Sequence, residues 1–159
     1  MSIHVRQART DDLKTLWNIE RECFTTEAFT KEQLEYLLEN PKGISLIARI
    51  DEEIAGFIVG VIHNHSIMRT GHVYAIDIVA KHRRKGVGLR LLRGLEQLFV
   101  ENEVEICYLE ARRENVAALE LYQKHGYTQV DVLKDFYSQG VDGVRLMKKL
   151  ASRKKIKAP

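Results

Sequence analysis

The chain has few of the residues that mark the more specialised protein classes. Cysteine occurs twice in 159 residues, at Cys23 and Cys107, and neither belongs to a closely spaced metal-ligand pair. Two isolated cysteines exclude a disulfide framework. The first ten residues contain no apolar segment typical of a secretory signal. No apolar run approaches the ~20 residues of a membrane helix. These absences predict a cytoplasmic domain without a metal site or a membrane segment.

Acidic residues are missing from two parts of the chain, although the net charge is only +3. The segment from Lys148 to the C-terminus contains six basic residues and no acid, so the remainder is net acidic. We expect residues 1–150 to form the domain and residues 151–159 a basic, flexible tail. Such a tail serves solubility, or it binds phosphate backbones of RNA or a ribosome. The second acid-free cluster, from Lys81 to Arg93, surrounds glycines.

Hydrophobic periodicity predicts a strand, two helices, three strands, a helix, a strand, a helix and two strands, in that order. Thr30 and Gln33 form a capping box at the start of the second helix. Gly126 ends the last helix. This order predicts an α/β (α+β) domain with a mixed sheet. The expected strands span residues 3–8, 44–50, 54–62, 73–79, 106–110, 127–133 and 144–150.

The segment Arg83-Arg84-Lys85-Gly86-Val87-Gly88 follows an apolar strand and precedes a strong helix. Glycines let a ligand approach the backbone, and the first N–H groups of a helix favour anions. The segment therefore indicates a pyrophosphate site. It is not a Walker A loop, because Leu89-Arg90 follows Gly88. It is not a Rossmann fingerprint, because position 91 is leucine.

Three further motifs accompany this turn. GHV occupies residues 71–73, LEARRENVAALELY occupies residues 109–122, and FYSQGVDG occupies residues 136–143. Together with Arg83-x-x-Gly86-x-Gly88, these motifs resemble the GNAT superfamily of acyl-CoA-dependent N-acetyltransferases. The similarity is strongest to the protein N-terminal acetyltransferases of the ribosomal-protein-alanine type. It implies the GNAT fold, a mixed sheet of about seven strands flanked by about four helices.

The resemblance implies acetyl-CoA as cosubstrate and no metal. The pyrophosphate is expected at the glycine-rich turn, and a backbone N–H of the central strand near Ile78 or Val79 is expected to stabilise the oxyanion. Asn115 is expected to contact the pantetheine or phosphate arm, although it is equally suited to cap a helix. The residues expected to bind the cofactor are Ile78, Val79, Arg83, Arg84, Lys85, Gly86, Val87, Gly88, Asn115 and Tyr122.

Three side chains are candidates for proton transfer. Glu110 ends an otherwise apolar strand, where partial burial raises a carboxyl pKa towards the range of a general base. The alternative is a solvated strand-end glutamate. His72 begins the central strand, and the resemblance implies that it shares proton handling with Glu110; otherwise it is an exposed histidine. Tyr122 is either a core aromatic residue or, by resemblance, the acid that protonates the leaving thiolate.

The resemblance also places a peptide between two loops. One wall is expected in the 24–29 loop, with Phe24 and Glu27, and the other in the 135–143 loop, with Tyr137. The sequence thus predicts transfer of acetyl from acetyl-CoA to the α-amine of a protein N-terminus, with a ribosome or an auxiliary subunit as a possible partner. Two alternatives stay open: a GNAT enzyme for lysine or small amines, and a CoA- or RNA-binding module without turnover.

Overall fold

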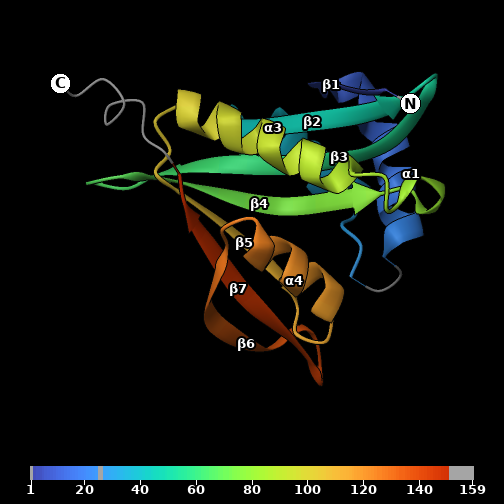
Figure 1. Cartoon of the computed structure of the whole chain (residues 1–159). Coiled ribbons are helices and arrows are strands. Elements are labelled where there is room, and N and C mark those ends of the chain that lie inside the picture. Colours follow the sequence, from blue (N-terminus) through green and yellow to red (C-terminus); the bar gives the residue numbers. More distant parts are fainter. Residues whose placement is uncertain (1, 25–26, 151–159) are drawn as a thin grey trace.

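The computed structural model describes residues 2–24 and 27–150, and the expected basic tail lies outside these residues. Within them the chain forms seven strands, four α-helices and two short 3-10 helices (Figure 1). The strands are β1 Ile3–Gln7, β2 Gly43–Ile50, β3 Glu53–Asn64, β4 Arg69–Ile78, β5 Ile106–Arg112, β6 Thr128–Ser138 and β7 Val141–Lys149. The helices are α1 Leu13–Cys23, α2 Lys31–Glu39, α3 Val87–Glu101 and α4 Val116–Lys124, with 3-10 turns at Thr10–Asp12 and Ala80–His82.

One mixed sheet organises the molecule, with strand order β1-β2-β3-β4-β5-β7-β6. All neighbouring strands are antiparallel except β4 and β5, which run parallel. This parallel pairing is short: it joins the stretch from Thr70 to His72 with the stretch from Ile106 to Tyr108. Beyond His72 the two strands diverge, and Figure 1 shows β5 and β7 turning away from β4 towards α4. The divergence opens the sheet at its centre.

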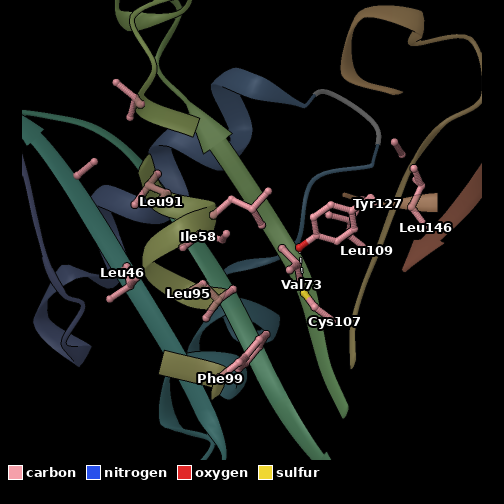
Figure 2. Packing of buried hydrophobic residues seen from close by; sticks show 14 of the residues in the cluster. Leu46, Ile58, Val73, Leu91, Leu95, Phe99, Cys107, Leu109, Tyr127 and Leu146 are labelled. Carbon is pink, nitrogen blue, oxygen red and sulfur yellow. Dashed lines mark hydrogen bonds between the residues drawn. The ribbon is translucent and has the colours of Figure 1, made fainter. Parts of the chain in front are cut away.

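Apolar side chains pack on both faces of the sheet. On one face α3 contributes Leu91, Leu95 and Phe99 to a core with residues of β2–β5 and β7, as Figure 2 shows. On the other face α1 and α2 pack Leu16 and Leu34 against the central strands. Because strand side chains alternate between faces, the nearly continuous apolar runs of β2 and β3 supply both cores.

The predicted element order is confirmed, and so is the capping box of α2. The Oγ1 atom of Thr30 accepts the Gln33 N–H at 3.1 Å, and the Oε1 atom of Gln33 accepts the Thr30 N–H at 2.9 Å. Three boundaries were wrong. β4 begins at Arg69, so His72 lies inside the strand, and β5 continues to Arg112, so Glu110 does not end it. Residues 135–143 were predicted as a loop but form the end of the β6–β7 hairpin: Ser138 pairs with Val141 and Leu133 with Gly143, with a register shift between these pairs.

Candidate active site

The divergence of β4 and β5 creates a cavity of about 460 Å³. Its walls come from the α1–α2 segment, β4, β5, α4 and the β6–β7 hairpin. It contains His72, Glu110 and Tyr122, the three residues predicted to handle protons. It also contains Phe24, Glu27 and Tyr137, the three residues predicted to contact a peptide.

His72 and Glu110 form a close pair in this cavity. Glu110 Oε1 lies 2.6 Å from His72 Nε2, and Glu110 Oε2 accepts a hydrogen bond from Arg145 Nε at 2.9 Å. Glu110 and Arg145 lie opposite each other in the β5–β7 register, which places their side chains on the same face. The Glu110 side chain is 9% exposed and that of His72 is 22% exposed, so the bonds are largely shielded from water.

This environment corrects the prediction of a raised Glu110 pKa. Burial acts to raise the pKa, but the hydrogen bonds and positive charge of His72 and Arg145 outweigh burial and hold it below its ordinary value. Glu110 is therefore an ionised carboxylate that only accepts hydrogen bonds. The hydrogen between Glu110 and a neutral His72 then sits on Nε2, which leaves Nδ1 of His72 as the proton acceptor.

A tyrosine on the same strand supports the face of the His72 ring. The rings of Tyr74 and His72 lie 4.3 Å apart between centroids. The hydroxyl of Tyr74 in turn lies 3.0 Å from His63 Nε2. Burial, together with the neighbouring His72, lowers the His63 pKa, which keeps this histidine neutral at neutral pH. His72 is thus held at its edge by Glu110 and at its face by Tyr74.

Aromatic residues form the two predicted walls. Phe24 and Phe29 line one side of the cavity, and Phe136 and Tyr137 line the other. Glu27 of the first wall forms an ion pair with Arg112 of β5, and the Arg112 guanidinium lies 5.5 Å from the centroid of the Tyr137 ring. These contacts tie the α1–α2 segment to the hairpin across the cavity mouth.

Tyr122 stands where the cavity meets a second, narrower opening of about 150 Å³. This second opening is lined by Ile76 and Ile78 of β4 and by Gly88 of α3. Burial raises the pKa of the Tyr122 hydroxyl, so it is a proton donor rather than an acceptor in this setting. A chain of bound groups can therefore run from the glycine-rich turn past Tyr122 to His72.

The open edge of β4 supplies a backbone donor, but at only one of the two predicted residues. The Val79 N–H donates to the Ala55 carbonyl at 2.8 Å, so it is already used by β3. Successive N–H groups of a strand point to opposite edges. The Ile78 N–H therefore faces the edge that β5 has left. The prediction that the Val79 N–H could serve as the donor is wrong, because β3 already uses that group.

The glycine-rich turn has the geometry of an anion site. Gly86 is the N-cap of α3 and has φ 83°, a left-handed conformation that favours glycine. The first backbone bond of the helix runs from the Arg90 N–H to the Gly86 carbonyl. The N–H groups of residues 87–89 thus precede the regular helical bonds and are available to a ligand. The nearest atom to a Cβ built at Gly88 would belong to the Ile78 side chain, at 3.8 Å. The space in front of this backbone is therefore open to a ligand.

The structure gives the other predicted cofactor residues different settings. Arg84 is exposed beside the turn. Arg83 Nε bonds the Ile78 carbonyl at 3.1 Å, and Lys85 Nζ lies 3.3 Å from His82 Nδ1. The Asn115 side chain accepts the Ala118 N–H at 3.2 Å, so it caps α4 and lies outside both openings. Its contact with a cofactor stays a prediction.

Sequence reasoning missed Arg145, Tyr74, Ile76 and Arg112. Tyr74 is two residues from His72, a spacing that places both side chains on one face of a strand. Arg145 stands between apolar Val144 and Leu146, which is the ordinary alternation of a half-buried strand and does not mark a site residue. The partner strand of Arg145 could not be read from either signal. In the part of the chain that the structure describes, no group of three or more potential metal ligands occurs and no helix is long and apolar enough to span a membrane.

Taken together, the splayed sheet, the anion site at α3 and the His72–Glu110 pair define an acyl-transferring enzyme with a nucleotide-linked cosubstrate. The sequence pattern described as "Acetyltransferase (GNAT) family" matches residues 13–127, which is most of the chain. The chain belongs to that family, and the predicted GNAT fold is confirmed.

Individual relatives agree with this assignment. The N-alpha-acetyltransferase of Saccharolobus solfataricus is 29% identical over 159 residues, covering 92% of each chain. Human N-alpha-acetyltransferase 30 is 30% identical over 122 residues, covering 76% of this chain and 34% of its own. The structure of the Escherichia coli ribosomal-protein-S18-alanine N-acetyltransferase superposes with a TM-score of 0.82 at 17% identity, covering 94% and 95% of the two chains. The NatC complex bound to Gag peptide and CoA contains a chain that superposes with a TM-score of 0.86 at 18% identity, over 95% and 100%.

Proposed function

We propose that this protein transfers acetyl from acetyl-CoA to the α-amine of a protein N-terminus. One observation carries the proposal: the cavity that holds the two aromatic walls and the His72–Glu110 pair adjoins, at Tyr122 and Ile76, the second opening that is lined by Gly88. A peptide end fits the first part, and a pantetheine arm fits the second. The names of the relatives support the same reaction.

The glycine-rich turn and the open edge of β4 fit acetyl-CoA. The free N–H groups at the start of α3 and the cations of residues 83–85 suit its pyrophosphate. The Ile78 N–H, on the edge of β4 that β5 has left and beside the second opening, donates to the oxygen that becomes negative when the amine attacks the thioester. Acetyl-CoA supplies the activated acetyl group, and the protein supplies position and proton transfer.

Proton removal falls to His72 rather than to Glu110. A free α-amine has a pKa of ~7.7–8.0, so a weak base suffices at neutral pH. His72 Nδ1 takes the proton, directly or through water, and the carboxylate of Glu110 stabilises the resulting imidazolium. Tyr122 donates a proton to the departing thiolate of CoA. Arg145 keeps Glu110 ionised and in place.

A panel of short peptides that differ only at the first residue (Ser, Ala, Thr, Met, Gly) tests the proposal by mass spectrometry. Each peptide carries one internal lysine, and a matched panel has a blocked N-terminus. We expect acetylation only on free N-termini. Acetylation of the lysine in both panels would favour the lysine alternative, and CoA binding without product would favour the module without turnover.

Two parts of the prediction concern context rather than chemistry. We expect the protein to act in the cytoplasm on nascent or completed chains. The same panel with the purified chain alone measures whether an auxiliary subunit is needed. Addition of ribosomes to the reaction shows whether a ribosome raises the rate.

A further inference from the structure

Two carboxyl groups lie buried in contact at the peptide wall of the cavity: Glu20 is part of the cavity lining, and Asp77 lies behind it. Glu20 belongs to α1 and is 2% exposed, and Asp77 belongs to β4 and is 1% exposed. Glu20 Oε2 accepts the Phe29 N–H at 2.9 Å, and Phe29 lines the cavity. The pair therefore connects the α1–α2 segment to the strand whose open edge faces the cofactor opening.

If both groups are ionised, the pair has more hydrogen-bond acceptors than donors. Glu20 Oε1 and both carboxyl oxygens of Asp77 have no hydrogen-bond donor among the residues that the structure describes. An ionised carboxylate only accepts, and two of them in contact in an apolar setting repel strongly. When one carboxyl carries a proton, the contact between Glu20 and Asp77 becomes a hydrogen bond.

Within residues 2–24 and 27–150, no hydrogen bond from a cationic side chain reaches the unpaired carboxyl oxygens of the pair. The ionisable groups that act on it are Cys23 of α1 and Arg83 after β4. Arg83 is directed to the Ile78 carbonyl and towards the Cys23 sulfur, at 3.1 and 3.8 Å. Burial, and the nearby Asp77, raise the Cys23 pKa, so the thiol stays neutral at neutral pH. β3 places the apolar Phe57 opposite Asp77.

The electrostatics agree with this geometry. Burial first, and then the hydrogen bond and charge of Glu20, raise the pKa of Asp77 to about 9, against a smaller lowering by Arg83. The pair thus holds one proton at neutral pH, and its net charge is −1 rather than −2.

We propose that Glu20 and Asp77 share one proton and act as positioning residues that hold the Phe29 wall of the peptide site against β4. Glu20 is part of the cavity lining, but proton transfer is assigned to His72 and Tyr122 and not to this pair. Loss of the shared proton places two negative charges in contact, which drives Glu20 away from β4 and loosens the wall at Phe29. The inference rests on the proposed function for its kinetic consequence, which is weaker peptide binding at alkaline pH.

The shared proton is tested first without any reaction. Infrared difference spectra between the wild type and Asp77→Asn are recorded over a pH series, with Asp11→Asn, an exposed acid, as the matched control. We expect a carboxylic-acid carbonyl band at neutral pH that disappears as the pH passes about 9. The control difference should contain no such band at neutral pH. Absence of the band from the Asp77 difference would overturn the inference.

The positioning role is tested by the Michaelis constants for peptide and for acetyl-CoA over the same pH series. For the wild type we expect the peptide KM to rise by about tenfold or more once the proton is lost, the effect of breaking one charge-assisted hydrogen bond. Asp77→Asn should flatten this rise, because its amide N–H replaces the shared proton. Asp77→Ala has no donor and should show a raised peptide KM at every pH.

These results separate the two proposals. If no peptide is acetylated but the acid band is present, the proposed function fails and the shared proton stands. If peptides are acetylated but Asp77→Asn follows the wild-type pH profile, the positioning role fails alone. An alkaline rise in the acetyl-CoA KM with no change in the peptide KM would also overturn it, since Phe29 belongs to the peptide wall.

Discussion

Replacement of Glu110 by glutamine tests the arrangement of the proton-transfer site. The carboxylate accepts from His72 at 2.6 Å and from Arg145 at 2.9 Å, through different oxygens. A glutamine amide has one oxygen and one NH₂ group, so it can accept from only one of the two. Arginine always donates, and the amide oxygen therefore turns to Arg145. The NH₂ group then donates to His72 Nε2.

This switch changes the tautomer of His72. When Nε2 accepts, the hydrogen moves to Nδ1, and His72 loses the free nitrogen that takes the substrate proton. General-base contributions are ~10²–10⁴-fold. Part of the α-amine is already neutral at its pKa of ~7.7–8.0, so we expect a loss in kcat at or below the lower limit of this range, about tenfold to a hundredfold. Acetyl-CoA affinity should change little, because Glu110 is remote from the glycine-rich turn.

The assay is a pH profile of kcat for Glu110→Gln and the wild type, with acetyl-CoA affinity measured by calorimetry. The defect should shrink as the pH rises and more amine loses its proton unaided. Glu110 itself does not titrate in this range, since its pKa lies below the ordinary value. The reasoning is refuted if the variant turns over at the wild-type rate between about pH 6 and 9, on both sides of the amine pKa.

Three other substitutions have defined outcomes. Gly88→Val places methyl groups in the opening beside Ile78, and should weaken acetyl-CoA binding by about tenfold or more in calorimetry, with an unchanged circular dichroism spectrum as the control. Tyr127→Phe removes a buried hydroxyl that bonds Glu96 at 2.7 Å, and should lower the free energy of unfolding in urea by about 1–2 kcal/mol; an unchanged midpoint would contradict it. Asp77→Asn should raise the melting temperature relative to the wild type, and the difference should grow with pH. The folded wild type retains a proton between pH 3.8 and about 9 that the unfolded chain releases, so wild-type stability falls as pH rises through that window. A pH-independent difference would contradict this sign.

Local signals predicted much of the fold. Periodicity, the capping box at Thr30 and the glycine at 126 depend on residues close in sequence, so one chain suffices to read them. The two strands of the β6–β7 hairpin were predicted, but their extension into residues 135–143 was not, because these polar residues resemble a loop and their pairing close to the turn at Gly140 depends on the partner strand. The start of β4 and the end of β5 were wrong for the same reason: β4 begins at Arg69, where it pairs with Asn64 of β3, and β5 continues to Arg112, where it pairs with Gly143 of β7.

The site was partly predictable. The glycine-rich turn could be read from glycine spacing and charge alone. The roles of His72 and Tyr122 entered through resemblance, and Glu110 was also noticed by its position in an apolar strand. Their meeting in one cavity depends on how β4 and β5 diverge. The environment of Glu110 could not be read, because Arg145 follows it by 35 residues and reaches it only through the β5–β7 register.

The burial of Asp77 against Glu20 could not be predicted from the pattern of charged residues. In the sequence it interrupts the apolar run of β4, which by itself indicates a residue aimed at solvent or at a catalytic cleft. The structure buries it against Glu20, from a helix that begins far earlier in the chain, and leaves three carboxyl oxygens without a donor among the described residues. Such a pair costs stability at neutral pH, and substitution of Asp77 by asparagine relieves that cost because the amide donates to Glu20 without a negative charge. The pair lies between Phe29 and β4, because Glu20 accepts the Phe29 N–H and Asp77 belongs to β4. The two carboxyl groups that lower the stability of the fold are therefore the ones that we propose to position the peptide wall.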